Sequence, residues 1–173
     1  MPDNALSPLI TAEELAGYLQ RDLDRFSAEL AIRGASGVVR TFCGWNLSQV
    51  VETLTVDANG SVSVNLPTLQ LNDVTEVRVD GQVLDPSQYG WGANGVLVAR
   101  YRWPDGLRRI AADVDHGYDP IPDELRIVAS TIAGRLYSNP EGLTQKSSGD
   151  NSRSFGAVLS DLEMRLITAY RLT

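Results

Sequence analysis

Apolar side chains recur every three or four residues near the start of the chain, which predicts two helices. The first is expected from Thr11, because Thr11 and Glu14 form a capping box in which each side chain hydrogen-bonds the other residue's backbone amide. The second is expected from about Asp22 towards Phe42. Two glycines in its middle, at positions 34 and 37, predict either a break in this helix or a close crossing with another one.

After residue 44 the hydrophobic period changes from about 3.6 residues to 2, which predicts strands. Residues 50–57 alternate between apolar and polar, and residues 62–66 alternate again. Between them lies the turn signal Asp57-Ala58-Asn59-Gly60. We therefore expect these two segments to pair with each other as a hairpin.

Two further reversals are predicted at Asp80-Gly81 and Asn94-Gly95, since both dipeptides favour tight turns between strands. Residues 110–114 form a last alternating strand. Short reversals imply an antiparallel or mixed sheet over about residues 48–118. They argue against a doubly wound parallel sheet, which needs long crossover connections.

A third helix is predicted after the strands. Pro122 suits the first helical position, and the acidic residues after it complement the positive end of a helix. Its apolar stripe consists of Leu125, Val128, Ile132 and Leu136. Asn139-Pro140 ends this helix, because the residue before a proline disfavours helical geometry.

Residues 140–156 are small and polar, with too few apolar side chains to pack by themselves. A terminal helix is predicted over residues 158–170. Its apolar positions are Leu159, Leu162, Leu166 and Tyr170. The spacing leaves two alternatives open for this helix: it folds back on its own domain, or it becomes ordered on a partner.

Together these patterns predict an α+β fold with three parts. Residues 1–46 and 119–139 form a small helical-bundle core, residues 47–118 form an inserted antiparallel or mixed β block, and residues 140–173 form a linker and an extended arm. With the arm helix, the chain has about four helices. Its length suits one domain, or one domain with a sizeable insertion.

Charge narrows the classes of partner. The chain has 15 basic and 22 acidic residues among 173, a net charge of −7. Residues 47–121 hold ten of the acidic and five of the basic residues. This argues against a protein that binds DNA by neutralising phosphates and against docking on anionic lipid. No apolar run approaches the roughly 18 residues of a membrane span, so no membrane partner is expected.

Motifs for catalysis are absent from the sequence. It has no phosphate-binding or dinucleotide-binding glycine loop and no serine nucleophile elbow. Cys43 and His116 are the only residues of their kinds, so a thiol–imidazole pair is the one nucleophilic candidate. Because Cys43 ends a helix, where a thiol pKa rises, we interpret it as a buried apolar residue and His116 as a hydrogen-bonded residue at a strand end.

Three aspartates, Asp113, Asp115 and Asp119, resemble a carboxylate cluster for a hard cation. The spacing of a calcium-binding loop is missing, however, and two alternating aspartates also describe the solvated face of a strand. We therefore predict no catalytic residue, no metal site and no cofactor.

One basic, aromatic-rich patch stands out in the acidic β block. Its residues are Arg100, Tyr101, Arg102, Trp103, Arg108 and Arg109. Such residue types are enriched at binding hot spots and can also stack on single-stranded nucleic acid. Since the surrounding segment is acidic, a protein interface and an exposed hairpin with Trp103 packed are the two favoured interpretations.

Four short sequence segments, taken in their order along the chain, match a known protein family. They are Thr11 to Leu15, the Phe42-Cys43-Gly44-Trp45 helix end, the run from His116 to Leu125, and a tail with Ser147 to Asp150 followed by Leu166 to Leu172. In these segments the sequence resembles the head–tail connector (head-to-tail adaptor) proteins of long-tailed bacteriophages, especially those of actinobacterial phages. It departs from them at Asn151, where an aromatic residue often stands.

The resemblance implies a structural virion protein at the head–tail interface, made in the cytoplasm of the host bacterium, and not an enzyme. Such proteins assemble as a ring, usually twelve-fold, beneath the portal; the ring extends the DNA channel and carries the stopper or tail-terminator protein. Double-stranded DNA is then cargo that passes without sequence-specific binding.

The resemblance also implies that the tail engages the portal. The tail residues expected there are Lys146, Asp150, Arg153, Phe155, Leu159, Leu162, Leu166, Tyr170 and Arg171. The basic patch would face a ring neighbour or the stopper. A stopper or tail terminator is the near alternative, and a cysteine hydrolase or a nucleic-acid-binding regulator is the alternative from a different class.

Overall fold

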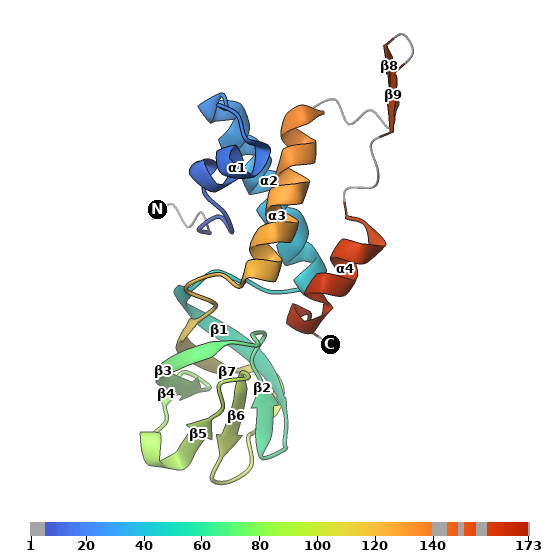
Figure 1. Cartoon of the computed structure of the whole chain (residues 1–173). Coiled ribbons are helices and arrows are strands. Elements are labelled where there is room, and N and C mark those ends of the chain that lie inside the picture. The colour runs from blue at the N-terminus through green and yellow to red at the C-terminus, as the bar shows by residue number, and fades with distance from the viewer. Residues whose placement is uncertain (1–5, 140–144, 149–150, 155–158, 173) are drawn as a thin grey trace. The chain divides into compact units, whose positions relative to one another are not determined.

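The computed structural model describes residues 6–139, 145–148, 151–154 and 159–172, and the side chains of residues 6–139 and 159–172 (Figure 1). The chain divides into two compact units. Unit 1 consists mainly of Trp45–Asp119, and unit 2 mainly of Ser7–Gly44 and Pro120–Arg171. Unit 1 is built of strands and unit 2 of helices, so the predicted α+β class is confirmed.

In the described part of unit 2 there are four α-helices: α1 (Ala12–Leu19), α2 (Arg25–Cys43), α3 (Asp123–Ser138) and α4 (Asp161–Ile167), the last followed by a short 3₁₀ turn, η2 (Thr168–Tyr170). Helix α1 begins with the predicted capping box of Thr11 and Glu14. Helix α2 begins at Arg25, about three residues later than expected, because Asp24 caps it by accepting a hydrogen bond from the Ser27 amide at 2.9 Å.

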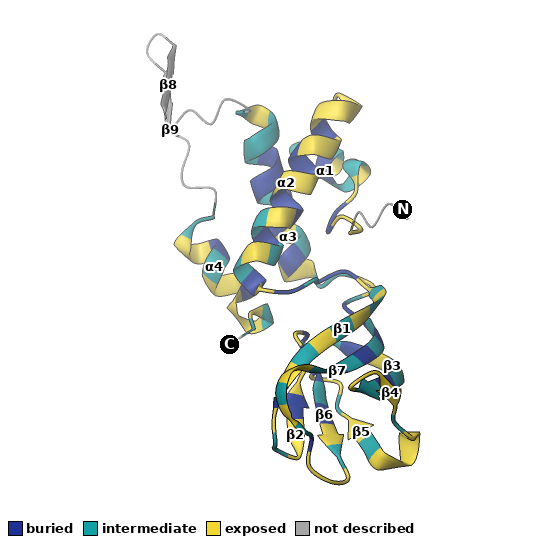
Figure 2. Cartoon of the chain, turned by 180° about the vertical axis from the view of Figure 1, so that it is seen from behind, coloured by how far each residue is buried: buried dark blue, intermediate teal, exposed yellow. Residues whose placement is uncertain are grey.

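Helix α2 runs unbroken through both of its glycines. A Cβ atom placed on Gly34 would lie 3.2 Å from the Cδ1 atom of Leu136 on α3, tighter than an ordinary contact. The close-crossing alternative is therefore the one that the structure supports. Helices α2 and α3 are in contact, and both have buried faces (Figure 2). Their buried residues include the small Ala28, Ala31 and Ala35 on α2 and Ala129 and Ala133 on α3. Small side chains allow the helix axes to approach closely.

Unit 1 contains two sheets with antiparallel pairing between neighbouring strands. The first has the order β1-β7-β3-β4, and the second β2-β6-β5. The strands are β1 (Val50–Asn59), β2 (Ser63–Asn65), β3 (Leu71–Val79), β4 (Gln82–Val83), β5 (Tyr89–Trp91), β6 (Val96–Ala99) and β7 (Asp105–His116), with a 3₁₀ turn at Pro86–Gln88. The turns at Asp80-Gly81 and Asn94-Gly95 join β3 to β4 and β5 to β6, as predicted.

The predicted hairpin between residues 50–57 and 62–66 is wrong. Strand β1 instead pairs with β7, from Val50 opposite His116 to Asn59 opposite Asp105, and β2 pairs with β6. The physical reason is length: β7 has 12 residues and pairs with β1 from end to end, with one irregularity between Val56 and Ala58, whereas β2 has three residues. Strand β7 thereby becomes the centre of the larger sheet, between β1 and β3.

The core of unit 1 lies between these strands, with Val77, Leu97, Trp103, Ile110 and Val114 among its buried residues. A further antiparallel pair, β8 (Gln145–Ser148) and β9 (Asn151–Ser154), lies in the polar segment where no strand was predicted. Within the residues that the structure describes, no helix has the length and apolar character needed to cross a membrane.

Candidate functional site

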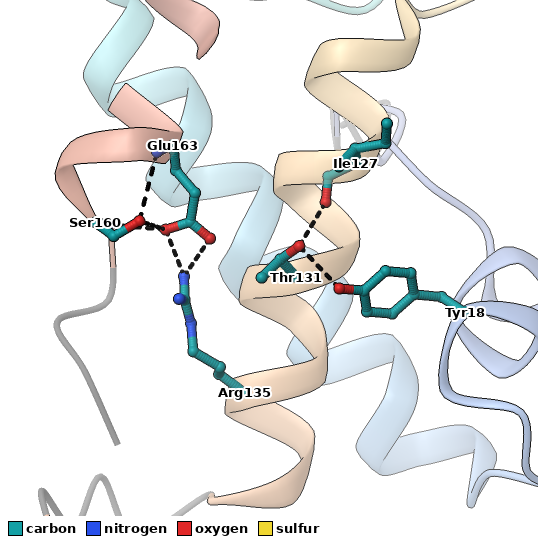
Figure 3. Close-up of polar contacts among 6 residues, drawn as sticks. All are labelled: Tyr18, Ile127, Thr131, Arg135, Ser160 and Glu163. Carbon is teal, nitrogen blue, oxygen red and sulfur yellow. Dashed lines mark hydrogen bonds and ion pairs between the residues drawn. The ribbon is translucent and has the colours of Figure 1, made fainter. Parts of the chain in front are cut away.

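Helix α4 is fastened to α3 by one carboxylate (Figure 3). Glu163 accepts hydrogen bonds from Arg135 Nη2 at 2.8 Å to each oxygen and from the Ser160 hydroxyl at 2.7 Å. Its oxygen also caps the Ser160 amide, so the same side chain completes the capping box that begins α4. Burial alone would raise the pKa of Glu163, but the hydrogen bonds from Arg135 and Ser160 outweigh it and hold the pKa below its ordinary value.

This attachment divides α4 into two faces. Glu163 and Ile167 are buried, whereas Leu162 is 68% exposed and Leu166 45% exposed. The leucine pair lies four residues apart, so it forms one apolar stripe on the open side of the helix. The predicted partner residues Leu162 and Leu166 are therefore accessible, while Leu159 is half-buried.

The end of the chain contacts its own unit. The Tyr170 hydroxyl donates to Glu124 Oε2 at 3.0 Å, and the Arg171 guanidinium lies over the Phe42 ring at 5.3 Å. Of the two alternatives for the terminal helix, folding back on its own domain is the one observed here. Lys146 and Arg153 lie on β8 and β9, where side chains are not described, and Asp150 and Phe155 lie outside the described residues.

The basic patch of unit 1 is smaller than predicted. Trp103 is buried in the core, as the alternative of an exposed hairpin with Trp103 packed expected, so it is removed from the predicted partner-binding residues. Arg100, Tyr101 and Arg102 are exposed. The Arg102 guanidinium donates to the Gly60 carbonyl at 3.1 Å, which places this loop beside the end of β1.

Arg108 and Arg109 belong to an irregular stretch of β7, opposite Asp57 on β1. The Arg108 amide donates to Asp57 Oδ1 at 2.6 Å, and Arg109 makes a two-point ion pair with Asp80. At this irregularity Leu107 points outward and is 81% exposed. Leu107 could not be singled out from the sequence, because one leucine in a hairpin has no spacing pattern that distinguishes it from a buried strand residue.

The strand aspartates have protein partners. Asp113 Oδ1 accepts hydrogen bonds from the Thr53 hydroxyl at 2.5 Å and from Arg78 Nη2 at 2.7 Å. These bonds hold the pKa of Asp113 below its ordinary value. Asp115 accepts from Gln49 and Asn72. In the sheet register Asp113 lies opposite Glu76 and Asp115 opposite Asp73, so four acidic residues lie on neighbouring strands of one sheet. Arg78 is ion-paired to both Glu76 and Asp113, so this surface keeps a net negative charge with one arginine among its four acidic residues.

The candidate nucleophile is inert. Cys43 is fully buried, and burial raises the pKa of its thiol to about 11, with Arg171 lowering it only in part. His116 is also buried, with Nε2 2.9 Å from Glu52 Oε1 and its ring stacked on Trp45 at 6.4 Å. Both the buried-thiol and the strand-end interpretations are confirmed.

Comparison with known proteins decides the family. A family model described as "Head completion protein" matches residues 8–153. The chain belongs to the head completion protein family. A head completion protein of Escherichia phage T5 is 25% identical over 134 residues, which are 75% of this chain and 76% of the phage protein. The family agrees with the predicted class of structural head–tail joining protein.

Solved structures share the fold of this family member. A chain in the neck of an empty gene transfer agent (GTA) particle, computed with C6 symmetry, has a TM-score of 0.66 at 15% identity and covers 95% of this chain and 90% of that one. A chain in the neck of the native particle, computed with C12 symmetry, has a TM-score of 0.60 at 16% identity, covering 97% and 95%. The covered share of this chain is large enough to include residues of both units.

Proposed function

We propose that this protein is a structural adaptor of the virion that joins the head to the tail as a closed ring on the portal. The observation that carries the proposal is the family match over residues 8–153, which spans both units. The GTA neck chains of the same fold come from structures computed with C6 and C12 symmetry, which supports a ring, twelve-fold as the sequence resemblance implies.

The exposed face of α4 is the portal-docking surface in this proposal. Leu162 and Leu166 offer an apolar stripe, while Glu163 and Ile167 hold the helix in place from behind. The tail residues of β8 and β9 belong to the same docking segment. A ring repeats this contact in every subunit, so weak individual contacts add up to firm attachment.

The acidic sheet surface fits a channel through which DNA passes. Negative side chains on β3 and β7 repel phosphates, the opposite of the counterion release that drives DNA binding. Arg100, Tyr101, Arg102, Arg108 and Arg109 would instead contact a ring neighbour or the stopper or tail-terminator protein. The role is structural, in keeping with a thiol that is buried and protonated.

A neighbouring part of the neck is the second candidate. The family description, head completion protein, also fits a stopper that closes the filled head. A stopper would bind a connector ring and not the portal itself. Binding to purified portal separates the two roles.

Genetic interruption tests the proposed function. A stop codon in this gene, within the phage genome that carries it, should yield separate DNA-containing heads and complete tails. Supplying the intact protein in trans should restore joined particles. Joined, infectious particles without the protein would refute the proposal, and empty unpackaged heads would move its role to an earlier step.

A further inference from the structure

Helix α2 presents an unpartnered apolar face. Phe26 is 72% exposed and Leu30 57% exposed, and they lie one helical turn apart on the side opposite the residues that α2 buries. Aromatic residues, Phe included, are enriched at protein–protein interfaces relative to the rest of the surface. We call this pair the α2 ridge.

A cleft of about 350 Å³ lies on a different surface of the same unit, between α1 and α3. Its apolar lining comes from Ile10, Tyr18 and Ile127, and its polar end from Glu14, Asp123 and Arg126. Tyr18 is held in place, since its hydroxyl lies 3.1 Å from the Thr131 hydroxyl (Figure 3). Ile127 stands 56% exposed at the rim.

The charges around the two surfaces are opposite. Beside the α2 ridge is the exposed Arg33. Arg25 is paired to Glu29 at 2.8 Å and also interacts electrostatically with Glu13 of α1, so its charge is balanced within its own subunit. At the cleft the Asp123 carboxylate is exposed. Asp123 and Glu14 share the single guanidinium of Arg126, so this end keeps net negative charge.

We propose that the α2 ridge of one subunit seats in the α1–α3 cleft of the next copy of this chain. The inference rests on the proposed ring and names its interface. Because ridge and cleft are different surfaces of one subunit, the contact is head-to-tail, and repetition closes it into a ring. The ridge brings two apolar side chains and the charge of Arg33 to a cleft with an apolar lining and a net negative end, so the two surfaces complement each other.

Thiol cross-linking of the full chain tests this interface. Phe26→Cys and Ile127→Cys are placed together in one chain, and a bismaleimide is used because its spacer spans more than the roughly 4.4–6.8 Å Cα separation of a disulfide. The native Cys43 stays, since it is buried and protonated. We expect a ladder of covalent oligomers, a covalent dimer when the two single variants are mixed, and none from Phe26→Cys alone.

A matched control pair joins Phe26→Cys to Leu162→Cys, which is equally exposed but lies outside the cleft. Suppose that sedimentation shows rings of the native chain, but the test pair gives no more cross-linked oligomers than this control pair. That result would overturn the proposed interface and leave the proposed function standing. A native chain that forms no ring, alone or with portal, would overturn both.

A second variant tests the ridge without cysteines. Phe26→Asp should raise the concentration needed for half-assembly by about tenfold or more, as expected for a central aromatic anchor. Its melting temperature as a monomer should not change, because Phe26 is exposed. Unchanged assembly of Phe26→Asp would also overturn the interface.

Discussion

Arg135 of α3 donates to both carboxylate oxygens of Glu163 on α4, each at 2.8 Å. Glu163 also closes the capping box of its own helix through Ser160. The same carboxylate therefore caps the N-terminus of α4 and binds the helix to α3. This double contact explains how a helix of seven residues holds its position. Short helices depend on such tertiary contacts, because helical propensity alone does not maintain them.

Replacing this carboxylate should release α4. We expect Glu163→Gln to lower the free energy of unfolding by about 1–3 kcal/mol, since it leaves the Arg135 guanidinium without its ionic partner. Amide hydrogen exchange of residues 161–167 should rise at the same time. Asp161→Asn, at an exposed position of the same helix turn, is the control and should change neither quantity by a comparable amount.

Acidification should weaken the same attachment. The pKa of Glu163 is lowered in the folded chain, so its contribution to stability is complete above the ordinary glutamate range and disappears as the pH falls below about 4. Thermal unfolding followed from pH 7 to pH 3 should show a smaller loss of stability in Glu163→Gln than in the native chain. Equal losses in both would contradict a role for this carboxylate.

The two glycines of α2 should respond differently to alanine. Gly37 faces open space, so Gly37→Ala should raise the free energy of unfolding by about 0.5–1 kcal/mol through better helical propensity. Gly34→Ala should gain less, because its Cβ would press on Leu136. Urea unfolding measures both; an equal gain at the two sites would show that Gly34 does not limit the helix crossing.

Cys43 should resist thiol reagents in the native protein. With a pKa of about 11, about a thousandth of the thiol is ionised at pH 8, and burial blocks access as well. Labelling with a chromogenic disulfide should be slow until denaturant is added and then become rapid. Fast labelling of the folded chain would contradict the interpretation of Cys43 as a buried, unreactive thiol.

The leucine stripe of α4 should matter for binding and not for folding. Leu162→Asp with Leu166→Asp should abolish attachment to purified portal and leave the melting temperature within about 2 °C, because surface substitutions cost little. Ile167→Ala is the opposite control: it removes a fully buried side chain and should lower stability by about 2–5 kcal/mol. Portal binding that survives both aspartates would move the docking surface elsewhere.

Local signals predicted the helices well. The capping box at Thr11, the stripe of α3 and the alternation after Gly44 all depend on short-range spacing, and each appears in the structure. The partner of β1 did not follow from the sequence. A turn signal after β1 favoured β2, whereas the pairing with β7 joins residues about 60 positions apart and depends on the length of both strands.

The orientation of α4 was equally hard to foresee. Apolar spacing marked Leu162 and Leu166, and such a stripe ordinarily faces the core. The structure instead buries Glu163 and Ile167, because Arg135 on α3 offers a charge partner that no local pattern reveals. This inversion leaves the leucines exposed on the surface.

Electron cryo-microscopy of the protein bound to its purified portal tests the central claim most directly. The account predicts a closed ring coaxial with the portal, with twelve subunits as in the C12 symmetry of the related neck, and with the Leu162 and Leu166 face of each α4 against the portal. Portal particles that carry no ring at saturating protein would contradict it.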